Sequence, residues 1–221
     1  MKTNRLLRGS CMAVIIAGSM LACNKGEYLT DGEDLISQKL DSPKIEVAVQ
    51  QTGFNRFVGA PIDGSIGTKW IRNYTNTQQG KMEYFLLMSE LQKLLTDSRA
   101  VGICLYYALN EQADKILIPI ALDQDGRIIK QFSVTTEDGK IDWETAQKWI
   151  SRFDGSIKAH FFGSNTFERL RNIPECSVIR ANYALDDKGN PQALLSNAAE
   201  IDPLVYEDAS RPCPPYCPIN N

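Results

Sequence analysis

Apolar side chains recur with the period of an α-helix along residues 142–153. Asp142 stands directly before this run and is a residue type that caps helix N-termini by accepting a backbone hydrogen bond. The pattern therefore predicts an amphipathic helix that starts after Asp142 and packs one face on a core. The apolar residues of that face are Trp143, Ala146, Trp149, Ile150 and Phe153.

The residues that follow predict a strand, a second helix and two further strands. Pro174 ends the second helix because proline lacks the backbone donor that a helix interior needs. Residues 186–190 have the composition of a hairpin turn, so the last two strands are expected to pair antiparallel. The predicted elements are a strand at 160–162, a helix capped by Ser164 or Asn165, and strands at 177–185 and 192–199.

The first half of the chain predicts the same order of elements. Residues 110–114 have the composition of a hairpin turn, and residues 123–126 form a further turn before segment 127–134. The predicted elements are a helix around 66–74, a strand at 82–87, a helix capped by Ser89 that runs through Leu95, and strands at 101–109 and 115–122.

The two halves also share residues at fixed spacings. Lys69-Trp70-Ile71 recurs 79 residues later at 148–150, and Tyr107-Ala108-Leu109 recurs 76 residues later at 183–185. An ungapped register over residues 85–109 favours an internal duplication, with a three-residue insertion or deletion before it. The alternative is a coincidence between two amphipathic segments.

Strands joined by short turns predict an α+β fold with mainly antiparallel sheets, built from a duplicated helix-strand-helix-strand-strand unit. Whether the two repeats form one domain or two is left open. In the tail, five prolines remove backbone donors and predict an irregular course. The predicted segments are a signal peptide at 1–22, a tether at 23–44, a first repeat at 45–135 that opens with a strand at 45–49, a second repeat at 136–202 and the tail at 203–221.

The N-terminal residues follow the pattern of an export signal. Three basic residues precede an apolar stretch at 11–21, which is shorter than the roughly 20 residues that a membrane-spanning helix needs. The stretch ends in Met20-Leu21-Ala22-Cys23, which resembles the lipobox of a bacterial lipoprotein signal. The resemblance implies cleavage before Cys23 and lipid on its sulfur. The alternatives are an ordinary signal peptide and an uncleaved anchor.

A lipid at Cys23 would hold the protein at a membrane of the cell envelope. Asn24 is not the aspartate that retains some lipoproteins in the inner membrane, so the outer membrane is the expected location. Removal of Lys2, Arg5 and Arg8 with the leader leaves 21 Lys and Arg against 27 Asp and Glu, a formal charge of −6. This acidic balance argues against a nucleic-acid partner, which requires a basic surface.

Candidate chemistry is sparse. Cys213 and Cys217 predict a local disulfide or two exposed thiols, because a redox motif places two residues between its cysteines and a helix behind them. Cys104 and Cys176 are expected either to pair across the halves or to be buried as small apolar residues. His160, the one histidine, matches Tyr84 in the repeat, which favours packing over catalysis, so a structural or a surface imidazole is expected. No metal site and no cofactor is expected.

One turn resembles the start of a calcium-binding loop. Asp123-Gln124-Asp125-Gly126 has the opening pattern, but the twelfth position, which needs Glu, is Val134. A plain β-turn is the preferred interpretation.

Trp70, Trp149 and Trp143 are the candidates for a binding surface, since aromatic residues are enriched at recognition sites. Their helical spacing fits packing in a core better. The leader and the repeated hairpin, with Phe161-Phe162-Gly163 before its second copy, resemble uncharacterised exported lipoproteins of Gram-negative bacteria. The resemblance brings no functional residues.

Two functions remain open. The preferred hypothesis is a non-enzymatic envelope lipoprotein that binds an envelope protein or a small molecule, or has an accessory role. The alternative is an extracytoplasmic enzyme whose site is assembled from scattered residues between the two repeats.

Overall fold

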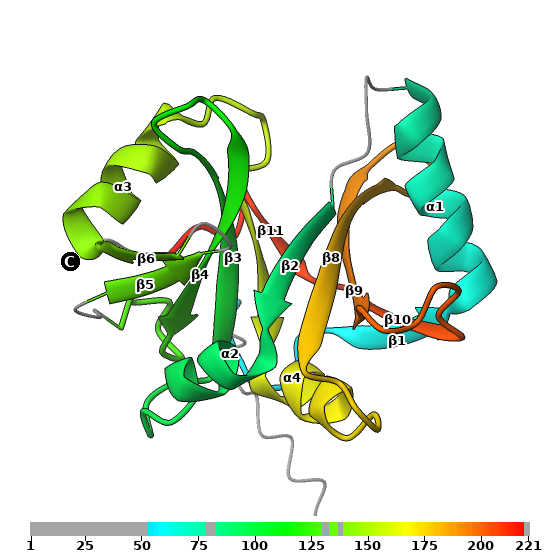
Figure 1. The fold of residues 1–221 in the computed structure, drawn as a ribbon, viewed down its shortest axis with the longest axis horizontal. Helices are drawn as coiled ribbons and strands as arrows, with labels where there is room; N and C mark the ends of the chain where they lie inside the picture. Colours follow the sequence, from blue (N-terminus) through cyan, green and yellow to red (C-terminus); the bar gives the residue numbers. More distant parts are fainter. Residues whose placement is uncertain (1–52, 78–82, 130–132, 137–138, 219–221) are drawn as a thin grey trace, which may run out of the picture. The chain divides into compact units, whose positions relative to one another are not determined.

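The computed structural model of the chain describes residues 53–77, 83–129, 133–136 and 139–218. These residues form an α+β fold with mainly antiparallel sheets, so the predicted fold class is confirmed (Figure 1). The predicted leader, tether and strand at 45–49 lie outside the described residues.

Four helices and eleven strands are present in the described residues. The helices are α1 (Gly64–Thr77), α2 (Met88–Leu94), α3 (Trp143–Arg152) and α4 (Ser164–Arg171). The strands are β1 (Ala60–Asp63), β2 (Glu83–Leu87), β3 (Gly102–Leu109), β4 (Lys115–Leu122), β5 (Ser133–Thr136), β6 (Gly139–Asp142), β7 (Ala159–Gly163), β8 (Val178–Leu185), β9 (Pro191–Asn197), β10 (Val205–Asp208) and β11 (Arg211–Cys213).

Two sheets share a central core. One sheet has five strands in the order β1-β10-β9-β8-β2, and the other has four in the order β11-β7-β3-β4. The hairpin of β5 and β6 lies beside β4 (Figure 1). The central core takes side chains from both sheets and from α2 and α4, among them Leu86, Leu91, Leu105, Phe162, Phe167 and Ile179.

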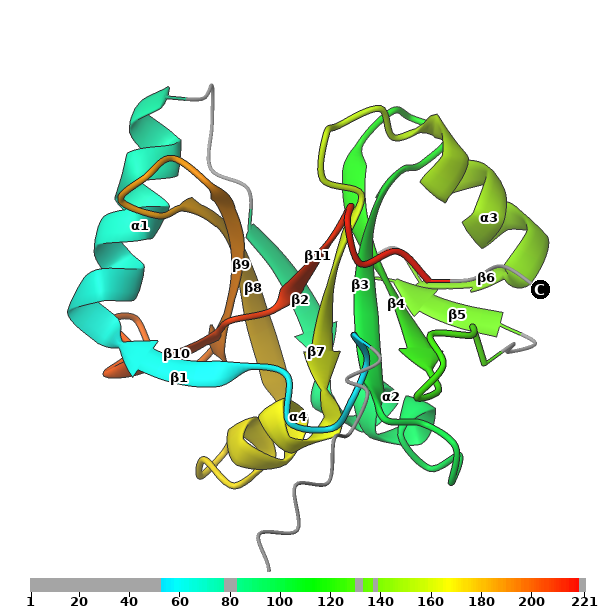
Figure 2. The ribbon, with the colours of Figure 1, turned by 180° about the vertical axis from the view of Figure 1, so that it is seen from behind.

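Helices α1 and α3 cover the outer faces of the two sheets (Figure 2). Trp70 and Ile71 of α1 pack against a small cluster that includes Leu194 and Tyr206 of the five-stranded sheet. Ala146 and Trp149 of α3 belong to a larger cluster on the other sheet. Burial of one apolar helix face is what the periodicity predicted.

The two halves of the chain exchange strands. β2 of the first half pairs antiparallel with β8 of the second, and β7 of the second half pairs antiparallel with β3 of the first. The registers match: Leu87 lies opposite Val178, while Gly163 and Gly102, at the corresponding repeat positions, lie opposite each other. The two halves are therefore not separate modules, because each sheet needs strands from both.

The ion pairs at the hairpin turns follow the same exchange. Lys69 Nζ of α1 lies 2.7 Å from Asp187 Oδ1 in the second half, and Lys148 Nζ of α3 lies 3.1 Å from Glu111 Oε1 in the first. Helix, strand, helix and paired strands thus recur in the predicted order, with corresponding contacts.

Two of the three predicted helix caps are wrong. Asp142 does cap α3, and its carboxylate accepts from the backbone N–H of Thr145 at 2.7 Å. The caps predicted at Ser89 and at Ser164 or Asn165 are absent, since α2 and α4 follow their strands directly. The first N–H of each helix is satisfied by a neighbouring strand or loop instead: Met88 donates to Ser177 O and Ser164 to Val101 O, both at 2.9 Å.

The prediction of an irregular tail is also wrong. β10 inserts between β1 and β9, and β11 pairs with the edge of β7. Pro212 is tolerated in β11 because this is an edge strand, where a missing donor interrupts no further pairing.

Candidate functional site

An apolar groove runs beside β2, at the edge of the five-stranded sheet. Its volume is about 300 Å³, and strands β2, β4, β5 and β8 and helix α2 contribute its walls. We call it the β2 groove. Its lining residues are Phe85, Leu86, Leu87, Glu90, Leu91, Pro119, Thr135, Thr136 and Val178.

Two large apolar side chains of β2 are exposed at this groove. Phe85 is 45% exposed and Leu87 is 51% exposed, whereas Tyr84 and Leu86, which alternate with them, are buried in the central core. The alternation follows from the pleat of the strand, which directs successive side chains to opposite faces. The outer face of β2 is therefore an apolar surface in contact with solvent.

The edge of β2 also presents backbone hydrogen-bonding groups. The N–H of Met88 donates to Ser177 O at 2.9 Å, so the backbone N–H at this position faces β8. Pairs alternate along an antiparallel ladder, so Phe85 and Leu87 occupy non-hydrogen-bonded positions toward β8. Their N–H and C=O groups point to the outer edge, where no described strand pairs with β2.

The polar residues of the β2 groove are held by contacts within the protein. Glu90 accepts from Lys93 Nζ at 2.6 Å and from Thr135 Oγ1 at 3.0 Å, and Thr136 Oγ1 donates to Gly139 O at 3.0 Å. The hydrogen bond from Lys93 lowers the pKa of Glu90, so its carboxylate is ionised at neutral pH. The groove thus has apolar walls and one charged end.

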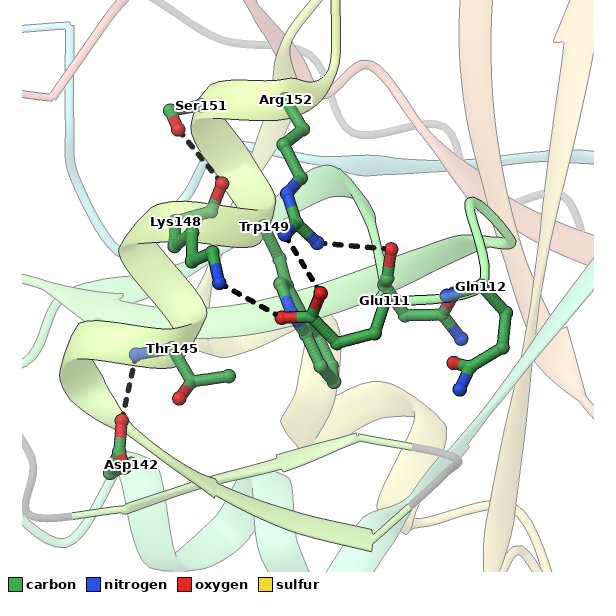
Figure 3. A network of polar contacts seen from close by, with 9 residues as sticks. Glu111, Gln112, Asp142, Thr145, Lys148, Trp149, Ser151 and Arg152 are labelled. Carbon is green, nitrogen blue, oxygen red and sulfur yellow. Dashed lines mark hydrogen bonds and ion pairs between the residues drawn. The ribbon is translucent and has the colours of Figure 1, made fainter.

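The three tryptophans do not form a common surface. Trp149 is buried, and Trp70 and Trp143 are partly buried against two different clusters. Figure 3 shows side chains of α3 around the Glu111 carboxylate. Trp149 Nε1 donates to Glu111 at 3.2 Å, and Arg152 lies 2.8 Å from the same carboxylate.

These contacts attach α3 to the turn between β3 and β4. The hydrogen bond from Arg152, followed by those from Trp149 and Lys148, lowers the pKa of Glu111 to about 2. In this setting Trp149 packs and positions an ion pair, which agrees with the packing interpretation of its helical spacing.

The cysteines of the described residues occur in two states. Cys213 and Cys217 form a disulfide in the tail, one of the two states considered for them. Cys104 and Cys176 are buried free thiols, so they do not pair across the halves. Burial raises the pKa of both thiols, which makes them poor nucleophiles. Cys23 lies outside the described residues.

His160 is a residue of β7, which lies between β11 and β3, and its side chain is buried. Its ring contacts Tyr107 edge to face, and Nδ1 lies 2.8 Å from Ser210 Oγ. Burial lowers the pKa of His160 to about 4, so the ring is neutral at physiological pH. Asp208, two residues before Ser210, is also buried. Desolvation raises the pKa of its carboxyl group to about 6.

The turn at Asp123 is a plain turn. Asp123 Oδ1 accepts from the backbone N–H groups of Asp125 and Arg127, both at 2.9 Å, and Gly126 has the positive φ of 78° that such a turn requires. Within residues 53–77, 83–129, 133–136 and 139–218, no three Cys, His, Asp or Glu side chains gather in a way that could hold a metal ion.

Sequence reasoning missed the β2 groove. In the sequence, Phe85 stands only at the start of the ungapped register over residues 85–109, and the apolar patterns around Phe85 and Phe161 are similar. No local signal could have found it, because the pairing partner and the free edge of the 82–87 strand depend on residues almost a hundred positions away.

Among helices in the described part of the chain, none combines the length and the apolar character that crossing a membrane requires. No protein-family model, no curated protein and no solved structure matches this chain.

Proposed function

We propose that this protein is a lipid-anchored, extracytoplasmic binding protein of the cell envelope that holds a partner in the β2 groove. The observation that carries the binding role is the exposure of Phe85 and Leu87 side by side on β2. Exposed apolar side chains that line a groove are typical of interaction sites. The anchor rests on the lipobox that ends at Cys23, with the outer membrane as the proposed location.

The chemistry of the groove favours binding over catalysis. Glu90 is the one carboxylate among its lining residues, and Lys93 and Thr135 already satisfy it. An enzyme of the kind considered from the sequence would need converging acid and base groups at its site. We further propose that the two halves arose by duplication, on the basis of the matched registers of β2–β8 and β7–β3.

A photoreactive side chain tests the binding role in intact cells. Phe85 is replaced by p-benzoylphenylalanine, and the matched control carries it at Phe57, which is 73% exposed but lies outside the groove. We expect a discrete cross-linked adduct from position 85 and none from position 57, measured by mass shift and mapped by mass spectrometry. Equal adducts at both positions, or none at position 85, would refute a binding site at β2.

The anchor has its own test. We expect Cys23→Ser to abolish incorporation of radiolabelled palmitate and to leave a precursor that keeps residues 1–22, because the acylated sulfur is required before cleavage. Cys11→Ser, which removes a thiol within the apolar stretch, is the control and should label normally. Palmitate labelling that persists in Cys23→Ser would contradict the lipoprotein assignment.

A further inference from the structure

The exchanged halves provide a counterpart of the β2 groove. β7 occupies the position in the second half that β2 occupies in the first, and Phe161 corresponds to Phe85. Phe161 is 0% exposed, against 45% for Phe85. The same residue type at the same repeat position is therefore covered on one side of the molecule and open on the other.

Extended segments of the chain itself cover β7. The ring of Phe54 packs edge to face on Phe161, with ring centroids 5.0 Å apart. β11 pairs antiparallel with β7 and places Arg211 opposite Phe161 (Figure 2). Further along the same edge, the N–H of Gly163 donates to Val58 O at 2.8 Å. The apolar surface and the backbone groups of β7 are thus both satisfied by added segments.

No described segment takes these places at β2. Phe85 on β2 lies opposite Arg180 on β8. In the corresponding pair of the other sheet, Phe161 lies opposite Cys104, and both belong to a buried apolar cluster. On the side of β2, β5 and β6 pair as a hairpin. On the side of β7, β10 and β1 also pair, but they are separate segments of the chain, and residues 53–59 lead into β1. Among the residues that the structure describes, the open side therefore has neither an equivalent of the incoming segment nor an equivalent of β11.

One difference between the two sides defines how an occupant can sit. A Cβ on Gly163 would lie 2.4 Å from Arg56 O, so glycine is needed where the backbone approaches closely. The corresponding residue on β2 is Leu87, whose side chain forms part of the groove wall. An occupant of the β2 groove must pair in the manner of β11 and pack against Leu87 rather than pass over it.

We propose that the free edge of β2 binds an extended segment of a partner protein, which adds antiparallel to β2 and places apolar side chains on Phe85 and Leu87. This inference rests on the binding function proposed above. The antiparallel direction follows β11 on β7. Strand addition satisfies the outward N–H and C=O groups of Phe85 and Leu87, which an apolar small molecule would leave to water.

Selection from a peptide library tests the occupant. The probe is a phage-displayed library of random dodecapeptides, selected on the purified full chain, after which an enriched peptide is synthesised and its Kd measured. We expect Phe85→Lys to weaken binding by roughly tenfold or more, while Phe57→Lys changes it less than about twofold. Unchanged thermal unfolding of both variants shows that the fold is intact.

Methylation of the peptide backbone separates strand addition from general apolar contact. Within an added strand, alternate N–H groups face β2, so single N-methyl groups should abolish binding at every second position and be tolerated between. Equal sensitivity at successive positions would overturn the inference, as would failure to enrich any peptide. A dimer of the full chain that Phe85→Lys dissociates would do the same, because the occupant would then be a second copy.

The two proposals fail in different experiments. A cross-link from position 85 in cells, together with N-methyl effects that do not alternate, keeps the binding function and removes strand addition. Absence of any adduct from position 85 removes the binding function itself.

Discussion

Phe161→Ala is expected to lower the free energy of unfolding by about 3–5 kcal/mol, whereas Phe85→Ala should change it by less than about 1 kcal/mol. Phe161 is fully buried between β11, β3 and Phe54, so its removal loses apolar burial and leaves a cavity. Phe85 occupies the same repeat position but is nearly half exposed. The measurement is urea-induced unfolding of the two variants and the unsubstituted chain.

The matching strand positions of the two phenylalanines make this comparison well controlled. Residue type, substitution and strand position are the same, and the covering segments make the difference. A loss from Phe85→Ala comparable to that from Phe161→Ala would mean that Phe85 contributes to the folded core. Its exposure would then no longer point to binding.

Arg169→Ala is expected to cost about 3–5 kcal/mol of unfolding free energy, because it leaves a buried carboxylate without its partner. Arg169 Nε lies 2.7 Å from Glu207 Oε1, and the side chain of Glu207 is only 6% exposed. The same guanidinium donates to Gly59 O at 3.2 Å and to Thr166 Oγ1 at 3.1 Å. The pair joins α4 to β10 and to the segment before β1.

An exposed ion pair provides the control for Arg169. Arg127 lies 2.7 Å from Asp125, but both side chains are substantially exposed, so Arg127→Ala should cost no more than about 1 kcal/mol. Arg169→Lys should fall between the two alanine variants, since a lysine keeps the charge and loses the two-point contact. Equal urea midpoints for Arg169→Ala and Arg127→Ala would show that Glu207 is solvated after the substitution.

Local patterns predicted most elements of the fold. The strand predicted at 115–122 matches β4 to the residue, and Asp142 caps α3 as expected. These features depend on periodicity and on contacts between near neighbours. The strands of the tail were missed because five prolines in residues 203–221 favoured an irregular course. However, β10 itself contains no proline, and β11 lies at the edge of its sheet.

The candidate site could not be predicted in the same way. Phe85 and Phe161 stand in similar apolar runs, and only the covering by Phe54, Val58 and β11 distinguishes them. That covering joins residues that lie 50 to more than a hundred positions apart, which no local pattern encodes. The proposed anchor at Cys23 remains a sequence prediction.

The exchange of strands has a consequence for how the chain acquires its structure. When the first half has been synthesised, β2 still lacks β8, and β3 still lacks β7. Pairings between such distant segments form late, because long loops must close first. These pairings therefore make folding slower. Neither half can complete its sheet before the other is present, because each sheet contains strands from both halves. The described residues must therefore fold as a single cooperative unit after both halves have been synthesised.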